Sequence, residues 1–262
     1  MRFCSLYSGS SGNSMFVASQ KAKILIDAGL SGKYIEKALD QIRENPKDIN
    51  AIFVTHEHTD HIKGVGVLSR KYDIPIYANE STWKAMLKNV GKIKENNIKI
   101  MDKNSVCIKD LEVVGYDIPH DAAKPTGYSV ICKDKKACVA TDIGYFSDQI
   151  KEQLADADVI LLESNHDVEM LKFGPYPYSL KRRILSNVGH LSNEDCGKAI
   201  MDIIGGYKKK KIILGHLSKT NNYPELAFKT VVNVLSDEGI RIEKDIAITM
   251  AKRDMPSGYT EF

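Results

Sequence analysis

Residues 55–61 read Thr55-His56-Glu57-His58-Thr59-Asp60-His61 and follow directly on the apolar run Ala51-Ile52-Phe53-Val54. A buried strand that ends in three imidazoles and a carboxylate places these groups at one edge of a sheet, where a loop can fold them around metal. Nitrogen and oxygen ligands suit zinc, manganese and iron, and soft thiolate is absent from the stretch. Four such groups cannot all reach one tetrahedral ion from a strand, so the pattern predicts a two-metal hydrolytic centre.

A solvated polar loop is the alternative interpretation of this stretch. For one isolated histidine that interpretation would be preferred. Several imidazoles crowded after a buried strand destabilise a fold unless something binds them, because burying unpaired polar or charged groups costs free energy. The stretch is therefore interpreted as a metal site.

The composition is that of one globular domain. The chain has 262 residues, of which 43% are hydrophobic and 27% charged, and no boundary or repeat divides it, so a single domain over residues 1–262 is expected. No apolar run approaches the length of a membrane span, and the first residues lack the apolar core of a signal peptide. We expect a protein that does not enter membranes.

The cysteines bear on the cellular compartment, and the net charge bears on the kind of substrate. The five cysteines are scattered, with no Cys-x-x-Cys, and are predicted to be small buried thiols in a reducing compartment, so a cytoplasmic location is expected. A net charge of +3 does not by itself indicate a nucleic-acid-binding protein. It is compatible with an anionic substrate.

The hydrophobic pattern predicts strands interspersed with helices, rich in hairpins at both ends of the chain. Strands are expected at 1–7, 13–18, 23–26, 51–54, 74–77, 97–101, 105–108, 111–118, 127–132, 136–141, 159–163 and 211–214, with two more in 241–251. Helices are expected at 31–42, 62–68, 83–90, 147–155, 192–204 and 224–236. This order fits an α/β sandwich of two mixed sheets packed face to face, with helices outside.

Three later residues repeat the pattern of an apolar strand that ends in a metal-binding side chain. They are His120, Asp142 and His216. Each alone is ordinary, since a strand-end aspartate is usually a turn former. Together with the first cluster they complete an inventory for two ions. One ion would take His56, His58 and His120; the other would take Asp60, His61 and His216; Asp142 would bridge them.

These residues, in this order, resemble the metallo-β-lactamase superfamily over nearly the whole chain. The resemblance implies an αββα sandwich with a dinuclear site at one edge. Further motifs are similar to those of the WalJ/YycJ family, and they are Gly9-Ser10-Ser11-Gly12-Asn13-Ser14, Ile118-Pro119-His120-Asp121-Ala122, Glu163-Ser164-Asn165-His166-Asp167, Gly189-His190-Leu191-Ser192-Asn193 and the segment from His216 to Asn222. That similarity implies a metal-dependent nuclease with 5′–3′ DNA exonuclease activity. Some motifs also resemble tRNA 3′-processing nucleases, but this chain lacks their long inserted arm.

The expected reaction is hydrolysis of a phosphodiester by a water or hydroxide held between two ions. Asp60 is assigned as a ligand and as acceptor of the water's proton. His190 is the first candidate for protonating the leaving oxygen, and His166 is the second. The alternative for each histidine is a role in packing, while Glu163 is expected to orient an imidazole.

Four basic residues are candidates for contacts with a nucleic-acid backbone, and they are Lys181, Arg182, Arg183 and Lys219. A solvated surface is the alternative for the run 181–183. DNA is the expected partner. Two other functions stay open: hydrolysis of small thioesters, esters or lactones on the same fold, and metal-stabilised regulatory binding without catalysis. The sequence leaves the native metal, the mode of cleavage and the oligomeric state open.

Overall fold

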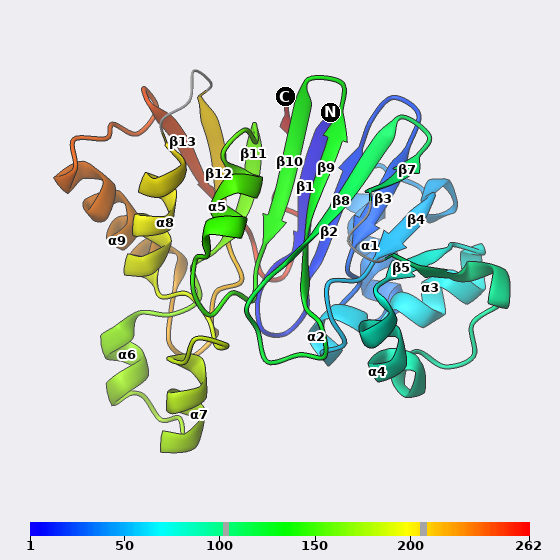
Figure 1. Ribbon diagram of the computed structural model, residues 1–262, viewed down its shortest axis with the longest axis horizontal. Coiled ribbons are helices and arrows are strands. Elements are labelled where there is room, and N and C mark those ends of the chain that lie inside the picture. The colour runs from blue at the N-terminus through cyan, green and yellow to red at the C-terminus, as the bar shows by residue number, and fades with distance from the viewer. Residues whose placement is uncertain (102–104, 205–208) are drawn as a thin grey trace.

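The computed structural model describes residues 1–101, 105–204 and 209–262. Two seven-stranded sheets pack face to face, and helices cover their outer faces (Figure 1). This confirms the α/β sandwich expected from the sequence. The two chain ends lie close together, since Met1 and Phe262 are joined by hydrogen bonds at the edge of the first sheet.

The first sheet is built from both ends of the chain, in the order β14-β1-β2-β3-β4-β5-β6. Its strands are β1 (Arg2–Tyr7), β2 (Ser14–Ala18), β3 (Lys23–Ile26), β4 (Ala51–Phe53), β5 (Ile76–Ala78), β6 (Ile98–Ile100) and β14 (Thr260–Glu261). Pairing is antiparallel from β14 to β3 and parallel from β3 to β6. The strands β3 and β4 therefore end at the same edge.

The second sheet has the order β13-β12-β11-β10-β9-β8-β7. Its strands are β7 (Ser105–Ile108), β8 (Leu111–Asp117), β9 (Thr126–Cys132), β10 (Lys135–Ala140), β11 (Val159–Glu163), β12 (Lys210–Gly215) and β13 (Ile246–Met250). Pairing is antiparallel from β7 to β10 and parallel from β10 to β13. The carboxyl ends of β10, β11 and β12 thus share one edge.

Three layers of buried apolar side chains hold the sandwich together. The helices α1 (Gly32–Gln41), α3 (Val65–Tyr72) and α4 (Glu80–Val90) contribute to a core on the outer face of the first sheet. The helices α5 (Asp148–Leu154), α8 (Asn193–Ile203) and α9 (Pro224–Asp237) do the same for the second sheet. Between the sheets, Phe3, Phe53, Tyr128 and other residues form the central core. Such burial is the main driving force for this arrangement.

Most predicted helix starts are confirmed. Ser192 Oγ accepts a hydrogen bond from the Asp195 amide at 3.0 Å and caps α8, and Pro224 stands in the first turn of α9. Ser31 precedes α1 as predicted, but its side chain makes no capping hydrogen bond. Short 3₁₀ turns cover Pro46–Asp48 and Glu95–Asn97.

Three short helices and one strand were not predicted. The helix α2 (Thr59–Ile62) lies inside the histidine cluster. The helices α6 (Val168–Phe173) and α7 (Tyr178–Ile184) lie next to each other, below α8 and α9 in the view of Figure 1. Helices this short do not complete an amphipathic repeat, so periodicity cannot reveal them. The strand β14 was also missed. Of the two strands expected in 241–251, the structure has only β13.

The cysteine prediction was correct in part. All five cysteines are free, and Cys4, Cys138 and Cys196 are buried. Cys107 is exposed and Cys132 is half-buried, so the prediction of buried thiols is wrong for these two. Both lie toward the open edge of the second sheet, on β7 and β9, where covering is incomplete. Within the described ranges, no helix has both the length and the apolar character that crossing a bilayer requires.

One buried carboxylate ties the end of α1 to the first sheet and the C-terminal segment. Glu44 contacts Arg2 and Lys23 at 2.8 Å each and accepts a hydrogen bond from the Tyr259 hydroxyl at 2.8 Å. Burial alone would raise the pKa of Glu44, but the hydrogen bonds from Lys23 and Tyr259 and both nearby cations outweigh it and lower the pKa. The ionised form is therefore favoured in the folded state.

We expect Glu44→Gln to lower the free energy of unfolding by about 1–3 kcal/mol at pH 7, because charged hydrogen bonds are lost. Since the folded pKa is lowered, this contribution is present above the unfolded pKa of about 4.3 and is lost as pH falls through the folded value. Urea unfolding between pH 3 and pH 7 measures it. A stability difference from wild type that does not shrink at acidic pH would contradict the role of Glu44.

Candidate metal centre

Polar side chains from five strand ends converge because these strands end at the same side of the sandwich. Asp27 follows β3, the histidine cluster follows β4, Asp142 follows β10, Glu163 ends β11, and His216 follows β12. Parallel neighbours present their carboxyl ends at one edge, so these residues meet. Asp27, Asp142 and His216 have left-handed backbones, with φ of 60°, 59° and 55°. Non-glycine residues in this region are uncommon and cluster at functional sites.

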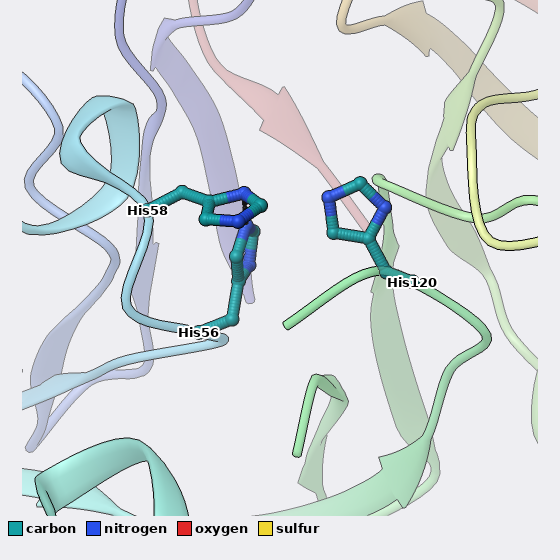
Figure 2. Close-up of side chains that lie close together, drawn as sticks. All are labelled: His56, His58 and His120. Carbon is teal, nitrogen blue, oxygen red and sulfur yellow. Dashed lines mark hydrogen bonds between the residues drawn. The ribbon is translucent and has the colours of Figure 1, made fainter. Parts of the chain in front are cut away.

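The first group of candidate ligands is His56, His58 and His120. One ring nitrogen from each lies within 4.8 Å of the others. Figure 2 shows His56 and His58 side by side on one loop and His120 reaching toward them from a separate segment. His120 Nδ1 lies 3.1 Å from the Gly189 carbonyl, so Nδ1–H donates there and Nε2 is left with a lone pair. That Nε2 faces the other two histidines.

The second group is Asp60, His61 and His216, whose ligand atoms again lie within 4.8 Å of one another. Asp60 Oδ2 is 3.6 Å from His61 Nε2 and 3.8 Å from His216 Nε2. Asp60 and His61 both belong to α2, so the motif itself contains a helical turn. The sequence analysis placed the helix after His61 and missed this turn.

Asp142 lies between the two groups. Its Oδ2 is 3.2 Å from His61 Nε2, and its Oδ1 is 3.4 Å from His216 Nε2 and 3.8 Å from His120 Nε2. The carboxylate thus has an oxygen within ligand range of each group. The structure brings all seven predicted ligands close together. The two predicted triads are among the close groups, and two further groups overlap them: His56 with His61 and Asp142, and Asp142 with Glu163, His190 and His216.

The donor set fits divalent cations. The Nε2 atoms of His120 and His216 are buried and make no hydrogen bond among the described residues, although buried polar atoms normally do. The pKa of Asp142 is held well below its usual value, because His216 and His61 outweigh the effect of burial. The pKa of His216 is raised to about 10 by Asp142, Asp60 and Glu163, against the opposing effect of burial. A concentration of ionised carboxylates and inward lone pairs is suited to positive charge.

Glu163 holds two imidazoles at once. Its Oε1 lies 2.7 Å from His216 Nδ1 and 2.8 Å from His190 Nδ1, and its Oε2 accepts hydrogen bonds from the amides of Ile143 and Leu191. The histidines outweigh burial and lower the pKa of Glu163 to about 2. Because both Nδ1 atoms face this carboxylate, both Nε2 atoms are directed elsewhere. His190 is less buried than His216, with 13% of its side chain exposed against 1%.

Asp27 is a site residue that the sequence analysis did not assign. It is buried, its Oδ2 lies 2.8 Å from His61 Nδ1, and its Oδ1 accepts a hydrogen bond from the Thr55 amide at 2.8 Å. The Thr55 hydroxyl donates to Asp27 Oδ2 and lies 3.0 Å from His56 Nδ1. The pair therefore fixes the rings of both His56 and His61. The sequence does contain the pattern used for the other site residues, since Asp27 also follows an apolar strand.

We expect Asp27→Asn to weaken divalent-metal affinity about 10- to 100-fold, because its amide nitrogen would face another donor at His61 or Thr55. Asparagine tolerates the left-handed backbone, so the fold should be kept. Competition of zinc or manganese against a chelating dye measures the affinity, and circular dichroism checks the fold. The exposed Asp40→Asn is the matched control. Wild-type affinity in Asp27→Asn would show that Asp27 does not support the ligands.

The N-terminal loop packs against the same centre. Asn13 Nδ2 lies 3.3 Å from Asp60 Oδ2 and 3.1 Å from His61 Nε2, and Ser8 Oγ accepts a hydrogen bond from the His216 amide at 2.8 Å. Gly29 is required by close approach, since a Cβ there would lie 1.6 Å from the carbonyl oxygen of Asp60. The loop supports α2 and the end of β12.

His166 is not placed among the grouped ligands. It is buried, and neither ring nitrogen makes a hydrogen bond within the described part of the chain. Burial lowers its pKa to about 4. His190 lies closer to the ligands, with ring centroids 5.1 Å from His120 and 5.4 Å from His216. Geometry therefore favours His190 over His166 as the group that reaches a substrate.

The predicted basic residues lie on two segments, the helix α7 and the loop after His216. Arg183 of α7 makes a bidentate ion pair with Asp121, the residue after His120, so its charge is already engaged. Lys181 donates to the Lys172 carbonyl. Arg182 is exposed and, with Tyr178, lines an open cavity of about 470 Å³. Lys219 is exposed, three residues after His216.

Comparison with known proteins places this geometry in context. Residues 7–216 match the family model of the metallo-beta-lactamase superfamily. The chain is 45% identical to exodeoxyribonuclease YycJ of Bacillus anthracis, over 98% of this chain and 97% of the relative, and 44% identical to exodeoxyribonuclease WalJ of Streptococcus pneumoniae, over 99% and 97%. The metallo-beta-lactamase fold protein YhfI of Bacillus subtilis has a similar fold, with a TM-score of 0.71 and 14% identity over 97% of this chain and 98% of that one.

Proposed function

We propose that this chain, which belongs to the metallo-beta-lactamase superfamily, is a metal-dependent exodeoxyribonuclease that hydrolyses phosphodiester bonds of DNA. One observation carries the proposal. The chain is similar over its full length to two exodeoxyribonucleases, and it has two groups of candidate ligands with Asp142 between them. Three residues of each group would hold one ion, and Asp142 would bridge the pair. Zinc and manganese are the metals proposed, with iron a further candidate for the same donors.

When bound, the two cations would lower the pKa of a water molecule between them and neutralise charge on the phosphate. The chain's own part is to hold the ligands rigidly. Glu163 and Asp27 fix the rings of His216 and His61, and the Gly189 carbonyl fixes His120. Asp60, which is 25% exposed at its side chain, is placed at the open side and would accept the proton of the attacking water.

His190 would donate a proton to the leaving oxygen. Its Nδ1 faces Glu163, so Nε2 is directed away from that carboxylate, and 13% of the side chain is exposed. The neighbouring Asp142 Oδ1 lies 3.7 Å from His190 Nδ1, so the acid is beside the centre. His166 is the second candidate, although its burial separates it from an entering strand.

Basic residues near the centre would hold the DNA backbone. Arg182 and Lys181 lie on α7, and Lys219 lies beyond His216. Arg183 would contribute by fixing α7 to Asp121, and so to the ligand loop. The exposed Tyr178 beside Arg182 offers a flat face on which a base can stack.

The deciding experiment combines metal analysis with product analysis. We expect purified protein to contain about two zinc, manganese or iron ions per chain and to release mononucleotides from one end of a duplex. Duplexes labelled at the 5′ or the 3′ end give the direction, and loss from the 5′ end is expected. Internal fragments alone would contradict the exonuclease proposal.

The same protein should be offered S-lactoylglutathione and a cephalosporin. Turnover of the thioester or the lactam with inert DNA would support small-molecule hydrolysis, the first alternative. Metal binding with no hydrolysis of any of these substrates would support regulatory binding, the second alternative. The full-length similarity to exodeoxyribonucleases favours neither.

A further inference from the structure

Two open cavities lie beside the part of the metal centre that holds His216. Their volumes are about 610 and 410 Å³, and both are lined by Lys219, Arg253 and Asp254. Ser8 and Leu217 line the larger cavity, and these residues contact or adjoin His216. The cavities therefore open next to the candidate ligands, and the three shared residues stand between them.

Arg253 is held in place by backbone contacts. Its Nη2 donates a hydrogen bond to the Leu217 carbonyl at 2.6 Å, and its Nη1 lies so close to Gly9 that a Cβ on Gly9 would approach it to 2.7 Å. That Nη1 is buried and makes no hydrogen bond in the described ranges. A guanidinium with five donors therefore uses few of them within the protein.

The charge of these cavities is predominantly positive. Lys219, Lys252 and Arg253 line the larger cavity, against the single carboxylate of Asp254. Among the described residues, neither Lys219 nor Arg253 forms an ion pair within 4.0 Å. Burial lowers the pKa of Arg253, and the nearby Asp254 and Tyr176 oppose that shift. A charged group that is fixed and incompletely paired is suited to an anionic ligand.

We propose that Lys219 and Arg253 form a phosphate subsite that holds a DNA phosphate adjacent to the one cleaved. The inference rests on the proposed function and adds a specific subsite to it. Tyr34, which is 55% exposed, and Leu30 line the smaller cavity, so the base attached to that phosphate has an aromatic and apolar wall beside it.

Two single variants, Lys219→Gln and Arg253→Gln, and their combination test the subsite. We expect each single change to raise KM for DNA about tenfold and to reduce the slope of log affinity against log salt by about 1, since one phosphate contact is lost. Hydrolysis of bis-p-nitrophenyl phosphate should lose much less than hydrolysis of DNA, because this small diester has no second phosphate. The exposed Lys88→Gln on α4 is the matched control and should leave both substrates unaffected.

Binding without metal gives a readout that is independent of turnover. In EDTA, fluorescence anisotropy of a labelled oligonucleotide should show weaker binding by both variants and a smaller salt slope. Comparing oligonucleotides that carry a 5′-phosphate with oligonucleotides that carry a 5′-hydroxyl shows whether the subsite binds an internal or a terminal phosphate. Equal weakening on both supports the adjacent internal phosphate, whereas weakening on the 5′-phosphate alone would show a terminal-phosphate pocket and overturn the internal placement.

Two further results would overturn the subsite itself. Unchanged KM and salt slope in the double variant would show that neither residue touches DNA. Equal losses on DNA and on bis-p-nitrophenyl phosphate would show that the changes act through the fold or the metal centre. Failure of the proposed function is distinguishable, because wild-type protein would then cleave neither diester.

Discussion

Asp142→Asn is expected to hydrolyse DNA about a thousandfold more slowly than wild type, the largest effect in this chain. The substitution keeps the shape of the side chain and suits the left-handed backbone at this position, where φ is 59°. It removes a negative charge that lies within 3.8 Å of each of His61, His120 and His216. Both ions should therefore bind more weakly and lose their common ligand.

Two measurements check this expectation. Metal content after dialysis should fall below that of wild type, and the rate on labelled duplex should fall with it. Circular dichroism must show an intact fold, and Asp40→Asn, a change at an exposed aspartate of α1, should behave as wild type. Retention of both ions with near-wild-type hydrolysis would refute the bridging role of Asp142.

His190→Gln is expected to lower kcat on DNA about 100- to 1,000-fold while metal content is retained. The reason lies in the leaving group. The oxygen of deoxyribose is a poor leaving group and needs a proton, whereas p-nitrophenolate departs without one. The same variant should therefore lose much less activity on bis-p-nitrophenyl phosphate.

The comparison of leaving groups separates acid catalysis from a ligand role. His190 also lies in a group with Asp142, Glu163 and His216 whose atoms are close enough to hold an ion. If His190→Gln lost one ion and slowed both substrates equally, His190 would be a ligand and not the acid. His166→Gln is the paired variant, and the larger effect of the two on DNA identifies the donor.

The local sequence was sufficient for the architecture and for the candidate ligands. The strands β1 to β4 and β8 to β12 were predicted near their observed positions, because their apolar runs are continuous and bounded by turns. The ligands were detectable because a metal site needs particular side chains, and these stand at strand ends. The helices α6 and α7 were not detectable, since six or seven residues leave little periodic pattern.

What the sequence by itself determined is the chemistry of the centre: which nitrogen and oxygen donors exist, and at which strand ends they stand. Only the tertiary structure decided how those donors are held. Asp27 supports His61 across 34 residues, Glu163 supports both His190 and His216, and Arg183 is committed to Asp121. Donor identity is a property of single residues, whereas these pairings exist only once packed sheets bring distant segments within hydrogen-bond distance.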